Sequence, residues 1–149
     1  MTRAPEGDTV RFMIIRKADK KTEAGVMPSS ELLAAMMNYN EELAKAGVLL
    51  DGLGLHPSAK GARVKMAGGK PTVMDGPFAE TKELIAGFTM IQVRTKAEAI
   101  EWVKRWPVED GDVELEIRQV FEAEDFGPAL TPELRDQVDR VRDTATKKP

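Results

Sequence analysis

The chain has 149 residues, a length that suits one domain with its own hydrophobic core. It carries 22 Lys and Arg against 25 Asp and Glu, and the resulting net charge of −3 argues against nucleic-acid and anionic-membrane partners, which need a basic face. The absence of Cys excludes disulfides, thiolate nucleophiles and iron–sulfur ligation, and the single His excludes a multi-histidine metal site.

The first predicted elements are a strand, a helix and a second strand. Apolar residues enclosed by charged ones predict a buried strand over residues 10–16. A hydroxyl cap at Ser29 or Ser30 and apolar residues at three- and four-residue spacing predict an amphipathic helix of about four turns, which ends just before Gly47. The second strand is expected over residues 48–56, because the proline that follows cannot donate to a sheet ladder.

The middle of the chain predicts a hairpin and a central strand. Two short strand-like runs, 62–66 and 71–74, flank a Gly-Gly pair at 68–69 that supplies the positive φ angles of a tight turn. After a cluster of turn residues and a charged segment, the most apolar stretch of the chain predicts a central strand over residues 84–93.

The C-terminal part predicts a helix, a strand and a last helix. Thr95 and Glu98 have the spacing of a capping box, in which each side chain satisfies a free backbone N–H, and Pro107 ends that helix. Strict alternation over residues 113–118 predicts a half-buried strand. A cap at Thr131 followed by proline begins the last helix, whose thin apolar stripe must lie on another surface.

Two strand–helix–strand halves around a mid-chain hairpin predict an α+β, ferredoxin-like fold. Its antiparallel sheet carries the two main helices on one face, and the C-terminal helix is an addition. Several strands are apolar on both faces, so the sheet face opposite the helices needs a cover. A second copy of the same sheet is the simplest cover. We therefore predict a homodimer with sheets packed face to face.

The expected domain organisation is a flexible N-terminal tail over residues 1–9, the ferredoxin-like domain over 10–121 and a C-terminal extension with its helix over 122–149. The first eight residues contain no signal-peptide core, and no apolar run is long enough to cross a bilayer. We therefore expect a cytoplasmic protein without a membrane partner.

The segment DGPFAETKE at residues 75–83, followed by IAGF at 85–88, resembles the signature of the DGPF-domain proteins. These bacterial proteins belong to the YCII-related family, within the dimeric α/β-barrel group. The LDGLGL segment at 50–55 and the Pro-Ser pair at 57–58 match the family's second-strand pattern, and the similarity extends over about 10–121. Some related proteins carry a His–Asp pair proposed for acid–base chemistry, with the His near the first helix, where this sequence has none.

Three residues are candidates for proton transfer. His56 is a candidate general base, because imidazole is the side-chain group that ordinarily exchanges protons near neutral pH, although a solvated strand end is the simpler interpretation. Asp75 could act as a base or orient a ligand, or it could only open the turn by bonding its own backbone. Asp51 lies within an apolar strand, where a carboxylate faces a cavity or pairs with an arginine such as Arg11 or Arg16, although solvation at a strand edge is the simpler interpretation.

Two cations and one further acid are candidates for substrate binding. Lys82 could bind an anionic substrate while Glu80 donates or accepts protons. A charge run of this kind is, however, commonly a solvated loop. Arg11 is a second cation that could hold the charge of the substrate.

We predict cofactor-free, metal-independent acid–base chemistry on a small organic molecule, with anions among the candidates, in a cleft of the dimer. The alternative is a non-catalytic small-molecule sensor, supported by the resemblance because such proteins are often encoded near sigma factors. A third interpretation is a structural dimer, in which the DGPF segment is only a folding turn.

Overall fold

The computed structural model of the chain describes residues 8–147. The flexible tail predicted for residues 1–9 therefore lies, up to residue 7, outside the described residues. The chain divides into two compact units, Met1–Gln119 and Val120–Pro149, and each is described by itself.

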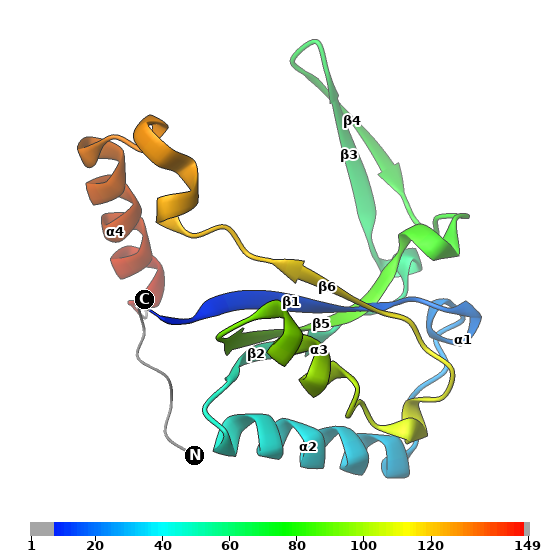
Figure 1. Cartoon of the computed structure of the whole chain (residues 1–149). Coiled ribbons are helices and arrows are strands. Elements are labelled where there is room, and N and C mark those ends of the chain that lie inside the picture. The colour runs from blue at the N-terminus through cyan, green and yellow to red at the C-terminus, as the bar shows by residue number, and fades with distance from the viewer. Residues whose placement is uncertain (1–7, 148–149) are drawn as a thin grey trace. The chain divides into compact units, whose positions relative to one another are not determined.

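The first unit contains a four-stranded antiparallel sheet in the order β2-β5-β1-β6 (Figure 1). Its strands are β1 (Val10–Lys17), β2 (Leu49–Gly54), β5 (Ile85–Val93) and β6 (Leu115–Gln119). Its helices are α1 (Lys20–Glu23), α2 (Ser30–Lys45) and α3 (Lys96–Val103), with short 3-10 turns η2 (Ser58–Lys60), η3 (Thr81–Glu83) and η4 (Val108–Asp110). The predicted α+β class and the antiparallel sheet are confirmed.

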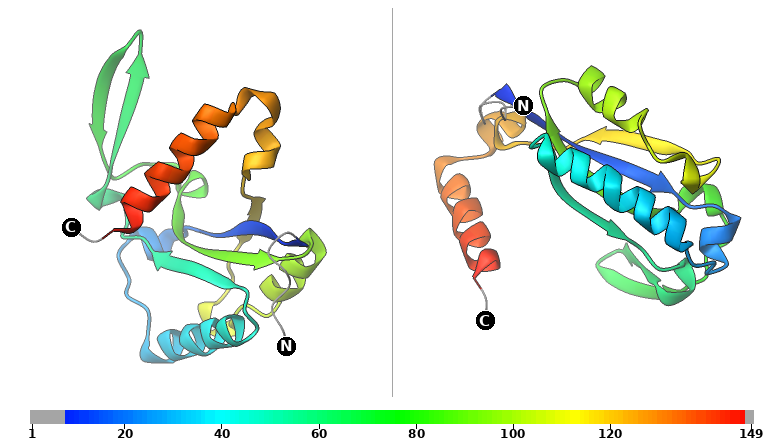
Figure 2. Two further views of the ribbon diagram at one scale, coloured as in Figure 1. Left: turned by 90° about the vertical axis from the view of Figure 1, so that its left-hand side faces the viewer. Right: turned by 90° about the horizontal axis from the view of Figure 1, so that it is seen from below.

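Helices α2 and α3 cover one face of this sheet (Figure 2). Phe12 and Ile14 of β1 are 3% and 0% exposed, because alternate residues of the strand point to the same face. They share one core with residues of β5, α2, α3 and the turn before β2, namely Ile91, Val93, Tyr39, Leu43, Ala99 and Val48. The Tyr39 hydroxyl donates a 2.7 Å hydrogen bond to the Trp102 carbonyl oxygen, and burial raises the pKa of Tyr39 to about 12.

Local signals in the sequence explain the helix ends. The Ser29 hydroxyl accepts from the Leu32 N–H at 3.1 Å, and Gly47 follows the helix with a φ of 75°, as predicted. The capping box predicted for α3 is only half correct. The Thr95 hydroxyl accepts from the Glu98 N–H, but the Glu98 carboxylate accepts from the N–H of Arg94, one residue before the cap.

The predicted hairpin forms a separate two-stranded sheet of β3 (Ala62–Ala67) and β4 (Lys70–Asp75). Its turn uses Gly68 and Gly69 at φ values of 57° and 78°, as the Gly-Gly pair predicts. In Figure 1 and in the left view of Figure 2 the hairpin projects to the side of the four-stranded sheet that lies away from α2 and α3.

The second unit contains η5 (Ala123–Ala129) and α4 (Pro132–Thr146). The Thr131 hydroxyl caps α4 by accepting from the Leu134 N–H at 3.2 Å, so the predicted start of this helix is confirmed. Phe121 and Phe126 stack with ring centroids 5.2 Å apart. No residue of α4 is buried in the described part of the chain, and the surface predicted to receive its apolar stripe stays a prediction.

A charged cluster lies at one end of the sheet, on the side of the helices. The Arg16 guanidinium donates to both carboxylate oxygens of Asp110, at 3.1 and 2.9 Å, and to Asp19 at 3.2 Å. Trp106 Nε1 donates to the same Asp110 carboxylate at 2.9 Å. Arg16 as a partner of Asp51 is therefore a wrong prediction, because Arg16 lies on the helix side of the sheet and Asp51 on the other.

We expect Arg16→Met to lower the free energy of unfolding by about 3 kcal/mol, because it leaves the Asp110 charge in a site where that side chain is only 10% exposed. Urea titration followed by tryptophan fluorescence measures the loss. The matched control is Lys104→Met, which removes an ion pair with Glu101 whose side chains are 66% and 69% exposed. Its expected effect is below about 0.5 kcal/mol. Equal losses in the two variants would contradict this assignment.

A second prediction concerns pH. The N–H of Thr22, which bonds the Asp19 carboxylate, and then the nearby Arg16, hold the pKa of Asp19 below its usual value. Because the pKa of Asp19 is lower in the folded state than its unfolded value of about 3.9, the ionised carboxylate stabilises the fold at a pH above about 3.9. This contribution is lost as the pH falls through the pKa of the folded state. We therefore expect the difference in unfolding free energy between the natural chain and Asp19→Asn to be constant near neutrality and to shrink below about pH 4. Urea titrations at several pH values measure it, and a difference that does not change with pH would contradict the assignment.

Candidate functional site

The sheet face opposite α2 and α3 is the first candidate site, and we call it the open face. Cross-strand pairing places its residues in three rows. The rows are Leu53, Phe88, Ile15 and Glu116; Asp51, Met90, Met13 and Arg118; and Gln92 with Arg11. Its centre is apolar, and its β1 and β5 side chains are half-buried in this single copy of the chain. An apolar sheet face of this kind is typical of an interface or a binding surface.

Asp51 is the acidic residue of β2 on the open face. A bulge at Leu50 puts it there, because Leu49 pairs with Ile91 and Asp51 pairs with the next residue of β5, Met90. Without the extra residue, Asp51 would face the helices. Its exposed carboxylate accepts from the N–H of Gly52 at 2.8 Å, which fixes its position beside the methionine.

Arg11 is the second predicted site residue on the open face. It is half-buried on β1, opposite Gln92, in the row next to that of Asp51. Because β5 lies between β1 and β2, a molecule that contacts both Arg11 and Asp51 must extend across the middle strand. The structure therefore places both residues on one surface without a direct pairing between them.

The other predicted site residues gather at the root of the β3–β4 hairpin. His56 follows β2 and Asp75 ends β4, where it pairs with Ala62. Glu80 and Lys82 lie at the 3-10 turn just before β5. All four side chains are exposed in the single chain. They are therefore available to a ligand or to a second subunit.

A hydrogen-bond network that sequence reasoning missed fixes this root. The Glu23 carboxylate accepts from the Ser58 N–H at 3.0 Å and from the Ser58 hydroxyl at 2.6 Å. The same hydroxyl accepts from the Phe78 N–H at 3.0 Å. The network joins α1, η2 and the DGPF turn, segments that are 35 and 20 residues apart in the chain. No short-range pattern could have indicated it.

Close backbone contact explains the glycine of the DGPF turn. A Cβ on Gly76 would lie 1.7 Å from the Ser58 carbonyl oxygen, so no other residue fits without a backbone shift. The Gly76 N–H donates to the Gly61 carbonyl at 3.0 Å, and the peptide bond to Pro77 is cis. The Arg63 guanidinium lies over the Phe78 ring, 3.9 Å from its centroid. The turn is therefore an anchor between the hairpin and the rest of the unit.

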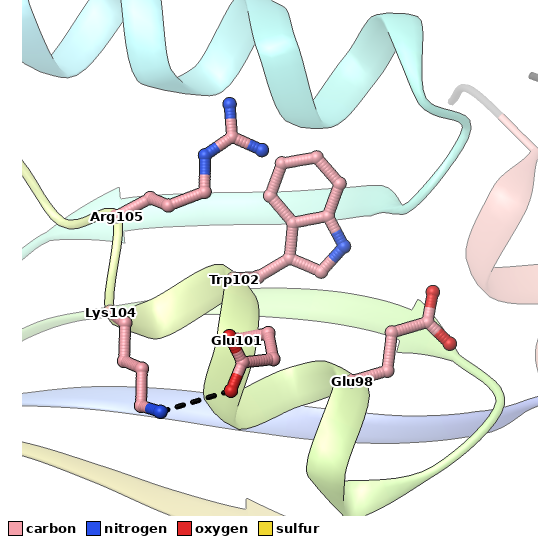
Figure 3. Close-up of a pocket in the computed structure, with 5 residues that line it drawn as sticks. All are labelled: Glu98, Glu101, Trp102, Lys104 and Arg105. Carbon is pink, nitrogen blue, oxygen red and sulfur yellow. Dashed lines mark hydrogen bonds and ion pairs between the residues drawn. The ribbon is translucent and has the colours of Figure 1, made fainter.

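A surface hollow on α3, of about 210 Å³, is a weaker candidate (Figure 3). Glu98, Glu101, Trp102, Lys104 and Arg105 line it. Its charged groups already have partners in the fold, since Lys104 bonds Glu101 and Arg105 pairs with Glu42 and lies over the Trp102 ring. The hollow is therefore explained by the packing of α3. Among the described residues, no group of His, Asp or Glu is placed to hold a metal ion, and no helix is long and apolar enough to cross a membrane.

An antiparallel α+β domain with a mid-chain hairpin and a glycine-anchored DGPF turn defines the class of this protein. The sequence profile of the YCII-related domain matches residues 10–124, and the chain belongs to that family. The chain is also similar to an uncharacterized protein of Rhizobium meliloti (strain 1021), with 36% identity over 72 residues. This match covers 48% of the chain and 56% of the relative, so the chain spans just over half the length of that protein.

We expect Gly76→Ala to lower the free energy of unfolding by about 3 kcal/mol, because the new methyl group and the Ser58 carbonyl cannot occupy the same space. The control is Gly54→Ala, where an added Cβ meets no atom within 4 Å. Thermal and urea unfolding of both variants measure the difference. A Gly76→Ala protein as stable as the control would show that the turn adjusts freely.

Proposed function

We propose that two copies of this chain pack open face to open face as a dimeric α/β barrel, which binds a small organic molecule between the sheets. In this proposal residues 10–121 form the binding domain and residues 122–149 an extension. The observation that supports the proposal most strongly is the uncovered apolar centre of the open face, which includes Met13, Phe88 and Met90. Burying such a surface gains roughly 25 cal/mol for each Å² removed from water.

Asp51 and Arg11 are the groups that bind and react with the molecule in this cleft. Both lie on the open face, so both become interior groups of the dimer. Electrostatic interactions are stronger in an enclosed site than at a wet surface. Arg11 binds the negative charge of an organic anion, and Asp51 accepts a proton from the bound molecule. Asp75, His56, Glu80 and Lys82 act from the rim, where Lys82 attracts anions and the other three can exchange protons.

The test of assembly is sedimentation velocity over a range of concentrations. We expect a dimer for the natural chain and a monomer for Met90→Lys, because an ammonium group in the middle of an apolar interface is desolvated without a partner. The control Lys45→Met changes an exposed residue at the end of α2 and is expected to stay dimeric. A natural chain that remains monomeric at every concentration would overturn the dimer and the cleft together.

The test of binding is a thermal-shift screen with small carboxylic acids. A ligand at 100 times its Kd stabilises the protein by about 2.7 kcal/mol, and we expect at least one such ligand. Asp51→Asn is expected to keep the dimer and to lose turnover of that ligand, whereas Asp143→Asn, in α4, keeps both. Binding without turnover by the natural chain would favour the sensor over the enzyme. A stable dimer that no acid stabilises would contradict the proposed ligand class.

A further inference from the structure

The β3–β4 hairpin carries a second uncovered apolar surface. Pairing places Ala62, Val64, Met66, Pro71 and Val73 on one of its faces. Val64, Met66 and Val73 are 58%, 64% and 65% exposed. A two-stranded hairpin is marginally stable alone in water, and a face of this kind is ordinarily packed against something. In a single chain the apolar face of the hairpin is therefore exposed to water, although its residues are of the kind that pack against another surface.

The root of the hairpin is fixed by hydrogen bonds, although all residues of its two strands are exposed. The Gly76 N–H bonds Gly61, and the Glu23–Ser58–Phe78 network ties the following turn to α1. The hairpin is thus fixed on the open side of the sheet, as Figure 1 and the left view of Figure 2 both show. An arm that is anchored on this side projects toward whatever covers the open face.

The length of the arm fits a second sheet. Each hairpin strand has six residues, which span about 20 Å at 3.3 Å per residue. Sheets that pack face to face lie about 10 Å apart. An arm rooted in one sheet therefore reaches beyond the sheet of a second copy and can lie along its edge.

The charges of the arm complement one edge of the same chain. Three basic side chains, Arg63, Lys65 and Lys70, lie on the face of the hairpin opposite the apolar one, in a chain whose net charge is −3. The single acid of the hairpin, Asp75, pairs with Ala62 at the root of the apolar face. The approach to β6 is acidic and exposed through Glu109, Asp112 and Glu114. We call this second group the acidic edge. Opposite charges of this kind steer two segments together during their encounter, and the apolar face of the arm then makes the contact.

The clasp requires a twofold axis parallel to the strands, and the sheet register gives the reason. The last residue of β2, Gly54, pairs with Gly87, and Gly87 pairs with Arg16, which pairs with Leu115 at the start of β6. The root of the arm and the acidic edge are therefore at the same end of the sheet, on opposite sides. A twofold axis parallel to the strands places β2 of one copy opposite β6 of the other. That operation sets each arm against the acidic edge of the second copy.

We propose that the β3–β4 hairpin is an arm that clasps the acidic edge of a second copy of this chain, with the DGPF turn as its anchor. The inference rests on the proposed homodimer and adds a second contact surface to it. It also gives the geometry of Gly76, Ser58 and Glu23 a role outside proton transfer, because these residues hold the arm in position.

The first experiment uses the absence of Cys from the natural chain. An affinity-tagged Lys65→Cys copy is mixed with an untagged Asp112→Cys copy and treated with a short bismaleimide. We expect a cross-linked product that contains one copy of each. The control replaces the untagged partner by Glu41→Cys, an exposed position on α2. The proposal is overturned if the Asp112→Cys partner gives no more mixed product than the Glu41→Cys partner.

The second experiment measures the strength of the dimer. We expect Val64→Glu combined with Val73→Glu to raise the dimer Kd at least tenfold, since it places two charges on the apolar face of the arm, which the second copy covers. The control Met37→Glu changes a 64% exposed side chain on α2 and is expected to leave the Kd unchanged. If the natural chain is a dimer and the double variant has the same Kd, the arm fails and the open-face dimer stands. If the natural chain is monomeric, both proposals fail.

Discussion

The structure depends on a sheet that is apolar on both faces but has helices on only one. Alternation along β1 puts Phe12 and Ile14 into the core and sends Met13 and Ile15 to the opposite side. Helices α2 and α3 exclude water from the first set. No described residue of the first unit does this for the second set. Because the helix side is filled, further apolar burial must come from the open side, and this constraint links the sheet, the hairpin and the proposed assembly.

A single inserted residue in β2 puts a carboxylate on the open face. The bulge at Leu50 reverses the alternation of β2, so that Asp51 shares a row with Met90. The DGPF turn has a different physical basis. Gly76 is required by the Ser58 carbonyl, and the Phe78 N–H is bound by the hydroxyl of the same serine. The acidic group among apolar neighbours and the family motif therefore lie in separate parts of the molecule, one on the open face and the other at the root of the hairpin.

The sequence predicts what is encoded locally. Apolar periodicity locates the strands and α2, and the residues at Ser29, Gly47 and Thr131 locate helix ends, because each acts on a backbone group within a few residues. Prediction fails where partners are distant. The Asp110 partner of Arg16 is 94 residues away, and the Glu23 partner of Ser58 is 35 residues away. The bulge is also not predictable from alternation, since both candidate registers of β2 bury a leucine. Of the candidate site, Asp51 and Asp75 could be named in advance, but their separation into two regions could not.

The construction of the hairpin has one more consequence. Its two strands contact the rest of the unit through the root, and its tip is a two-glycine turn. One cross-strand pair can therefore be added or removed near the tip, changing the reach by about 3.3 Å, while every bond at the base is preserved. The sheet with its helices and the hairpin can therefore diverge independently under natural selection. The core and the open face stay unchanged while the hairpin is lengthened or shortened to fit a different partner surface.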